Sequence, residues 1–229
     1  MKIGTKSVLY GAHAFWLHPF LIAYAWTKLY GFPWDPRLWW AFFVHDIGYI
    51  SLPNMDGEEG ECHPFTGANL MWPFDADEPY SFTRTYTKHV ARVVSFMCDA
   101  LWGKRAPGGM TWYCFCFYHS RFLAKRYGIR PSPLCMADKM VIVIEPAWLY
   151  LPRVRWSGEI DEYMSKAKSR NNEDPGKYSS MGLRTHSQRI WHRDMQNYVK
   201  RWIEEHKDGR EDTWTPETKQ ANTDSGVWK

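Results

Sequence analysis

The sequence predicts an all-α protein: a helical bundle with one C-terminal helix packed against its core. In several segments the apolar residues recur at three- and four-residue steps, which is the period of an amphipathic helix. Start and stop signals for helices, such as Asp35-Pro36 and Gly31, bound these segments. The 229 residues are 45% hydrophobic, and this content supports one sizeable core.

The first 71 residues contain three predicted helices. We expect the first over residues 18–30, where a Pro stands in the first turn and a Gly ends the pattern. The second starts behind an Asp N-cap and spans residues 36–48. A turn-rich, acidic segment over residues 53–61 then leads to the third, which starts at His63.

The middle of the chain continues the helical pattern. Residues 80–102 are predicted to be helical, and after a loop an aromatic helix leads from Met110 to His119. Residues 134–144 are strongly apolar. A β-strand is an alternative for residues 140–144, but the surrounding pattern favours a buried helix.

Two parts of the chain differ in composition. Residues 1–160, which hold most Trp residues, are predicted to form the main domain, with an inserted helical segment over about 80–107. Residues 161–229 are polar and are predicted to form an extension, with a loop over 166–178 and a flexible tail from Lys207 onward. One amphipathic helix of this extension carries an apolar stripe, formed by Trp191, Met195, Tyr198 and Trp202.

The composition argues against several classes of protein. The net charge of +4 and the pI of about 8.7 are mild, and the basic residues are spread out, so there is no strong nucleic-acid signal. The five Cys residues include no Cys-x-x-Cys pair. This pattern argues against a disulfide framework or a structural zinc knuckle, and it fits a reducing cytoplasm.

The N-terminal region superficially resembles a signal peptide, because two Lys residues precede an apolar run that ends in Ala23-Tyr24-Ala25, with the small residues of a cleavage site at its first and third positions. However, His13, His18 and Pro19 interrupt this run. No later stretch reaches the roughly 20 apolar residues that span a bilayer. We therefore expect a cytoplasmic protein without a membrane partner.

Candidate metal ligands lie on or beside the predicted buried helices. One apolar helix ends in the adjacent pair His45-Asp46. A buried carboxylate is costly unless a cation or hydrogen bonds compensate it, and imidazole is the commonest transition-metal ligand. Further candidates follow the same placement: His18, His63, His119 and Asp138. Together these residues predict a metal site.

The order of these residues resembles the HD-domain superfamily of metal-dependent phosphohydrolases. Residues 44–48 (VHDIG) resemble the family's HDIG element, and residues 63–68 (HPFTGA) resemble its HPxxGA element. Residues 137–139 (ADK) resemble its terminal ADK element. The resemblance covers roughly residues 13–145 and implies an HD-domain-like helical bundle.

The resemblance also implies a ligand set and its roles. It implies that Asp46 bridges two metals and that Asp46, His63 and His119 are catalytic. The implied metal ligands are His18, His45, Asp46, His63, His119 and Asp138.

Two further histidines compete for places in this set. His13 and His18 are five residues apart and face different sides of any common helix, so only one can be the first ligand. We choose His18, which lies at the start of the better-defined helix. His89 competes for an outer site, although a His on an amphipathic helix is more often a surface or hydrogen-bonded residue.

The expected activity is hydrolysis of a phosphoester bond in a nucleotide or related phosphorylated small molecule by metal-activated water. One or two divalent ions are expected, and the mixed ligands suit Mn, Fe, Co, Ni or Zn, with Mg as a further option. Arg121, Lys125 and Arg126 follow His119 within about two helical turns and are candidates for binding substrate phosphate. The alternative interpretation is that these three side chains lie on a solvated helix face and bind no substrate.

Three other functions remain open. The chain lacks the GYP element of the cyclic-dinucleotide phosphodiesterases in this superfamily. Residues 124–127 (AKRY) resemble a run in HD-type di-iron oxygenases that cleave organophosphonates, so such an oxygenase is the first alternative. The aromatic content of 17% is compatible with a non-catalytic nucleotide or nucleic-acid binding module, although most rings lie at core spacing. A degenerate scaffold for protein interaction is the last alternative.

Overall fold

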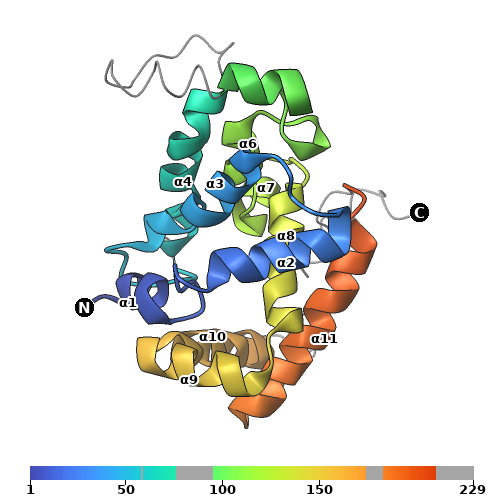
Figure 1. Ribbon diagram of the computed structural model, residues 1–229. Coiled ribbons are helices and arrows are strands. Elements are labelled where there is room, and N and C mark those ends of the chain that lie inside the picture. Colours follow the sequence, from blue (N-terminus) through green and yellow to red (C-terminus); the bar gives the residue numbers. More distant parts are fainter. Residues whose placement is uncertain (58, 76–94, 174–182, 210–229) are drawn as a thin grey trace.

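A computed structural model describes residues 1–57, 59–75, 95–173 and 183–209 and shows an all-α protein (Figure 1). These described residues contain no β-strand beyond one isolated bridge, so the predicted fold class is confirmed. Residues 95–102 are also helical. The labelled α-helices are α1 Ile3–Tyr10, α2 His18–Tyr30, α3 Pro36–Val44, α4 Pro64–Met71, α6 Trp112–Phe117, α7 Arg121–Arg126, α8 Pro133–Ile144, α9 Ala147–Ser157, α10 Glu159–Glu173 and α11 Gln188–His206. Short 3₁₀ helices are η1 Ile47–Tyr49, η2 Gly60–Cys62, η3 Trp72–Phe74 and η4 Pro107–Gly109.

Local sequence signals explain where α2 begins and ends and where α3 begins. Pro19 stands in the first turn of α2, and Gly31, with φ of 89°, ends that helix. The Asp35 carboxylate accepts a hydrogen bond of 2.9 Å from the Arg37 amide and caps α3. The expected helix to Gly48 was too long, because α3 ends at Val44 and the chain turns into η1.

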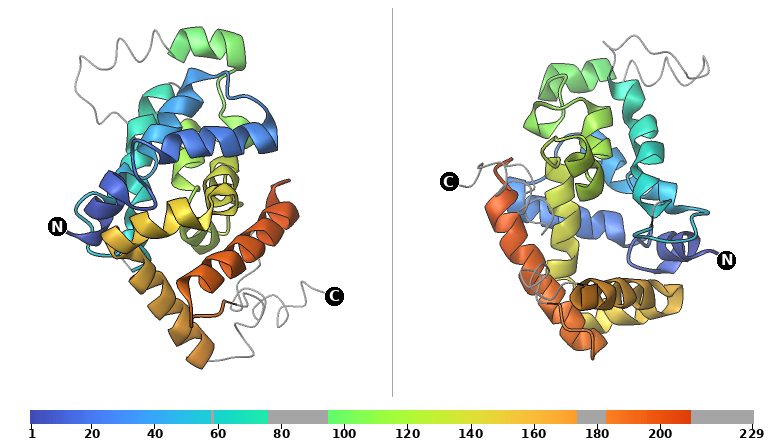
Figure 2. Two further views of the ribbon diagram at one scale, coloured as in Figure 1. Left: turned by 60° about the horizontal axis from the view of Figure 1, so that its bottom comes forward. Right: turned by 180° about the vertical axis from the view of Figure 1, so that it is seen from behind.

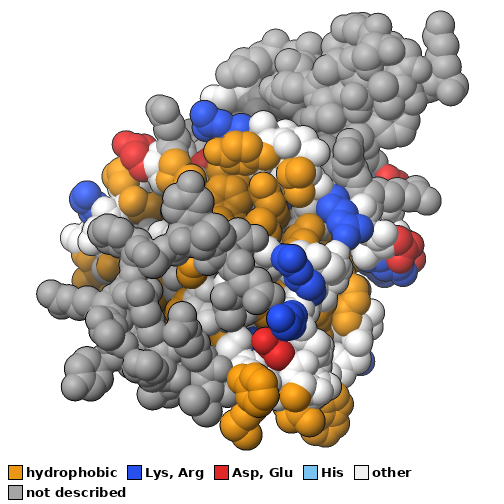
Figure 3. All heavy atoms as spheres, turned by 90° about the horizontal axis from the view of Figure 1, so that it is seen from above, with side chains coloured by type: hydrophobic (Ala, Val, Ile, Leu, Met, Phe, Trp, Pro, Cys, Tyr) orange, Lys and Arg blue, Asp and Glu red, His pale blue; other side chains and the backbone are white. Residues whose placement is uncertain are grey.

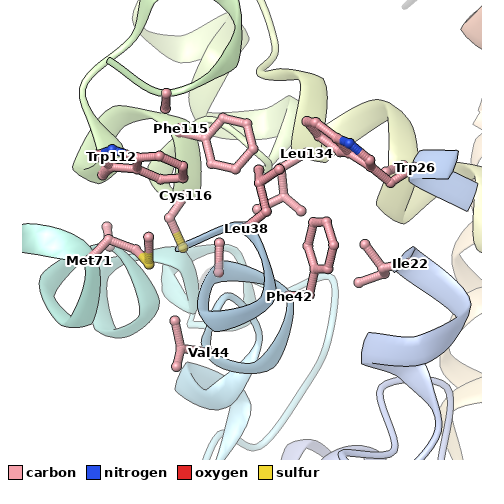
Figure 4. Packing of buried hydrophobic residues seen from close by; sticks show 14 of the residues in the cluster. Ile22, Trp26, Leu38, Phe42, Val44, Met71, Trp112, Phe115, Cys116 and Leu134 are labelled. Atoms are coloured by element: carbon pink, nitrogen blue, oxygen red, sulfur yellow. The ribbon is translucent and has the colours of Figure 1, made fainter. Parts of the chain in front are cut away.

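Helices α2, α3, α4, α6 and α8 enclose the main core. Figure 4 shows aromatic side chains from three of them in contact. The ring centroid of Trp26 in α2 lies 5.7 Å from that of Phe42 in α3 and 5.9 Å from that of Phe115 in α6. This packing uses the apolar faces that the helical period predicts. It also confirms residues 134–144 as a buried helix instead of a strand.

The C-terminal helices pack on the other part of α8. Figures 1 and 2 show α11 running along α8, with α9 and α10 together at the end of α8 that is remote from α4. Tyr198 and Trp202 of α11 pack with Met136 of α8. The predicted stripe and the docking of a C-terminal helix on the core are therefore confirmed. The domain boundary at residue 160 remains a prediction.

Several expectations need correction. Helices α1 and α9 were not predicted, and residues 166–173, expected as a loop, belong to α10. Tertiary contacts favour this helix: Ala167 is buried, and the Tyr163 ring stacks on Trp191 at 6.0 Å. The aromatic helix from Met110 ends at Phe117, and the run after His119 forms the separate helix α7.

Some predictions fall outside the described residues. These are the helix over residues 80–94, the side chain of His89, the loop over residues 174–178 and the tail from residue 210 onward.

No helix in the described part of the chain is long and apolar enough to cross a membrane. Figure 3 shows apolar side chains beside Lys and Arg side chains on one face of the molecule.

Candidate metal centre

The two motif segments meet through close backbone packing. A Cβ added at Gly48 would lie 2.0 Å from the His63 carbonyl oxygen, and one added at Gly67 would lie 2.7 Å from the carbonyl oxygen of His45. Only residues without a side chain permit this approach. The packing brings the end of α3, with His45 and Asp46, against the start of α4, with His63.

The first ligand group joins three helical segments that are distant in sequence. His18 Nε2 lies 3.1 Å from Asp138 Oδ1 and 3.2 Å from Asp46 Oδ2. His45 Nε2 lies 2.9 Å from Asp46 Oδ2 and 3.9 Å from Asp138 Oδ1. All four side chains are buried, and their ligand atoms lie within 4.8 Å of one another, so they can hold one metal ion.

The second group uses the other oxygen of Asp46. Asp46 Oδ1 lies 3.4 Å from His63 Nε2 and 3.3 Å from His119 Nε2. These three buried residues also place their ligand atoms within 4.8 Å of one another. The Tyr49 ring stacks on His63 at 3.8 Å and fixes its orientation. Asp46 thus divides its two oxygens between two groups of imidazoles.

The protonation of the second group favours a cation. His63 Nδ1 donates to the Gly60 carbonyl at 2.7 Å, and His119 Nδ1 donates to the Cys116 carbonyl at 2.5 Å. A carbonyl only accepts, so each neutral ring carries its proton on Nδ1 and turns a lone pair at Nε2 toward the other ring. These two Nε2 atoms are 3.0 Å apart. A cation between them would remove the repulsion of the lone pairs.

The atoms of the first ligand group also favour a bound cation. His45 Nδ1 lies 3.1 Å from the Phe42 carbonyl, which assigns a proton to Nδ1, so the neutral form of this ring has its lone pair on Nε2. His45 Nε2 and Asp46 Oδ2 are close, yet neither buried atom has a hydrogen-bond partner of acceptable geometry among the described residues. Burial of such atoms without a partner is costly, and two ligands of one ion approach each other in this way. The residues present therefore fit a metal.

Electrostatics set the charge of this cluster. Burial lowers the pKa of His45, but the carboxylates of Asp46 and Asp138 outweigh burial and raise that pKa to about 10. Burial also raises the pKa of Asp46, and the charge of His45 and other neighbouring histidines holds it well below its ordinary value. Burial lowers the pKa of His119 to about 4, so its imidazole is neutral at pH 7. A metal and a proton therefore compete at His45.

His13 borders the cluster, whereas His18 belongs to it. His13 Nε2 lies 3.9 Å from Asp46 Oδ2, and its Nδ1 is 2.7 Å from the Ser7 hydroxyl. The buried carboxylate of Glu159 accepts a hydrogen bond of 3.1 Å from the amide next to His13 and so anchors this loop on α10. The structure thus places the preferred candidate, His18, in the four-residue group.

A cavity of about 270 Å³ opens beside the first group, with His18 and Asp138 in its wall. Arg121 also lines this cavity, whereas the described wall does not include Lys125 or Arg126, which lie toward the C-terminal end of α7. Arg126 is exposed, as expected of a solvated helix face. The structure thus brings one of the three predicted phosphate-binding residues to the cavity.

Sequence reasoning missed other residues around the cluster. Lys139 Nζ lies 2.9 Å from Asp138 Oδ2 and lines the cavity. Burial raises the pKa of Asp138, but the Lys139 charge and hydrogen bonds from histidines hold it well below its ordinary value. A Lys next to a buried Asp in an apolar helix was a usable signal. No comparable signal marked Tyr49 or Glu159, because their neighbours are far away in the sequence.

Comparisons of this chain with models of known protein families, with curated proteins and with solved structures give no match.

Proposed function

We propose that this chain is a metal-dependent phosphohydrolase of the HD type, acting on a nucleotide or a related phosphorylated small molecule. One observation carries the proposal: Asp46 points one carboxylate oxygen at His18 and His45 and the other at His63 and His119. A carboxylate shared between two imidazole groups is suited to bridging two divalent ions. Two neighbouring ions suit reactions in which both the attacking and the leaving oxygen carry charge.

The protein would supply binding and charge. Hydrolysis forms a bond from a water oxygen to phosphorus, breaks the bond from phosphorus to the ester oxygen, and delivers a water proton to the departing alkoxide. A bound divalent metal would supply a Lewis acid that makes water more acidic and polarises the phosphoryl group. Lys139 and Arg121 line the cavity with positive charge that can hold phosphoryl oxygens. His18 and Asp138 are buried, so their interactions with a bound metal would be shielded from bulk water.

The same donor set favours a second candidate. Four imidazoles and two carboxylates are also good ligands for a pair of iron ions. An HD-type di-iron oxygenase acting on an organophosphonate would therefore use the same groups. The two candidates differ in what they consume, because only the oxygenase requires ferrous iron and dioxygen.

Metal analysis of protein purified without chelator tests the site. We expect up to two ions per wild-type chain, fewer in His119→Ala and none in Asp46→Ala, because Asp46 belongs to both groups. His186→Ala is the matched control, since His186 is exposed and outside both groups. Full metal content in Asp46→Ala would defeat the proposal.

Activity assays then separate the candidates. Wild-type protein reconstituted with each divalent metal should release phosphate from a panel of nucleotides and other phosphoesters, and Asp46→Ala should not. Turnover of organophosphonates that depends on ferrous iron and dioxygen would favour the oxygenase. Binding of nucleotides or single strands with no turnover under any metal would favour the non-catalytic module.

A further inference from the structure

The cavity beside the first ligand group is elongated. Its wall includes Asp138, Lys139 and Ile142 of α8 and Glu145, the residue that follows the last turn of that helix. Seven residues of α-helix separate Asp138 from Glu145, which corresponds to about 10 Å along the axis. Helices α10 and α11 supply much of the remaining wall. The cavity thus leads from the candidate metal centre toward the C-terminal end of α8.

The end at the metal centre is charged. His18, Asp138 and Lys139 lie there, and Arg121 follows the ligand His119 by two residues. The Arg121 guanidinium donates to the Tyr198 hydroxyl at 3.0 Å and lies 4.3 Å from the centre of the Trp202 ring. These contacts hold the guanidinium in place at the cavity wall, so little side-chain freedom is left to lose when an anion binds.

The far end combines aromatic and apolar side chains with the charged side chains of Glu145 and Lys166. Trp191 and Tyr150 are buried but line the cavity, and the Tyr163 ring lies parallel to Trp191, at 6° and 6.0 Å between centroids. The small side chain of Ala167 and the flexible Met195 lie in the same wall. Aromatic walls of this kind bind planar apolar groups by burial and stacking.

We propose that the cavity selects a small phosphomonoester with a single planar aryl or heteroaryl group, its phosphate near Lys139 and Arg121 and its ring beside Tyr163 and Trp191. This inference rests on the proposed function and names the substrate class for it. A volume of about 270 Å³ lies near the lower limit of common ligand pockets, which suits a small phosphomonoester better than a dinucleotide or a nucleic-acid strand.

Binding of stable phosphonates to metal-loaded protein tests the proposal without turnover. Phenylphosphonate carries the ring and methylphosphonate lacks it. Calorimetry should show phenylphosphonate binding at least about 10-fold more tightly, as expected for the burial of one ring. Equal affinities for the two phosphonates would overturn the proposal.

A variant that fills the aromatic end sharpens the test. Ala167→Phe should abolish the preference for phenylphosphonate, while metal content and methylphosphonate binding stay at wild-type values. Ser165→Phe is the control, because Ser165 is exposed on the same helix. Ala167→Val, a smaller change, should reduce the preference if the Phe variant does not fold. An unchanged preference in folded Ala167 variants would contradict the proposal.

The two proposals fail in different ways. A preference for phenylphosphonate without phosphate release from any ester would retain the cavity assignment and reject hydrolysis. Hydrolysis of alkyl and aryl monoesters with equal kcat/KM, and equal binding of the two phosphonates, would retain hydrolysis and reject the cavity assignment.

Discussion

The substitution Gly67→Ala tests how backbone packing positions the candidate metal centre. A Cβ at this position would lie 2.6 Å from the Val44 carbonyl oxygen and 2.7 Å from the Cα of His45. Ordinary contact begins at 3.4 Å, and the opposing atoms belong to backbone that cannot rotate away. Helix α4 would have to retreat by roughly 0.8 Å, a shift in which a carbon contact forfeits much of its attraction. His63, directly before α4, would move with it.

Two effects on stability oppose each other in Gly67→Ala. Ala favours a helix over Gly by about 1 kcal/mol, whereas overpacking of this kind costs about 1–3 kcal/mol. We expect a net loss of about 1 kcal/mol in the free energy of unfolding of the metal-free protein. Displaced support of metal ligands commonly weakens metal binding by about 10–100-fold. We expect a loss in that range, because His63 and Asp46 separate.

Urea unfolding of chelated protein measures the first effect, and competition with a metal indicator measures the second. Thr66→Ala is the matched control, since Thr66 is exposed in the same helix and its variant should bind metal like wild type. A Gly67→Ala protein that is more stable by about 1 kcal/mol and retains wild-type metal affinity would show that the close approach does not matter.

Two further predictions concern buried charges. Burial raises the pKa of Glu159 above its ordinary value of 4.5. The folded state therefore keeps this proton to a higher pH than the unfolded state does. The stability that this group contributes is lost as the pH rises from about 4.5 through the raised pKa. Urea unfolding between pH 4 and pH 8 should therefore show wild type losing stability relative to Glu159→Gln as pH rises; an opposite trend would reject the assignment. Arg37 pairs with Asp35 at 2.8 Å and with Asp99 at 2.6 Å and is fully buried, so Arg37→Met should cost about 3–5 kcal/mol, because it leaves these carboxylates without their cation. Exposed Arg155, changed to Met, is the control, and a loss below about 1 kcal/mol for Arg37→Met would contradict this reasoning.

Much of the fold follows from local signals in the sequence. Asp35 and Gly31 mark the ends of helices through capping and a positive φ, and both effects act over a few residues. The apolar stripe of α11 likewise reports a buried face without knowledge of its partner. Helix α10 was missed because its polar composition gives no such signal. Its support comes from distant contacts, such as the Glu162 carboxylate accepting from the amides of Met55 and Asp56.

The candidate site also has features that the sequence predicts and features that only the tertiary structure shows. The order of His18, His45-Asp46, His63, His119 and Asp138 is a property of the sequence, and it was enough to predict a metal site because these residue types are rare in apolar helices. The sequence could not show that Asp46 turns its two oxygens to different groups. It also could not show that Lys139 and Arg121 share a cavity with aromatic rings from α9, α10 and α11.

The residues capable of binding a metal, and their place on or beside apolar helices, were determined by the sequence alone, because residue chemistry and helical period are local properties. The division of those residues into two groups, and the cavity beside them, were decided only by tertiary structure. The physical reason is that Nε2 and carboxylate oxygens from segments up to 120 residues apart come within hydrogen-bonding distance only after the helices pack. That packing depends on side-chain shape across the whole core.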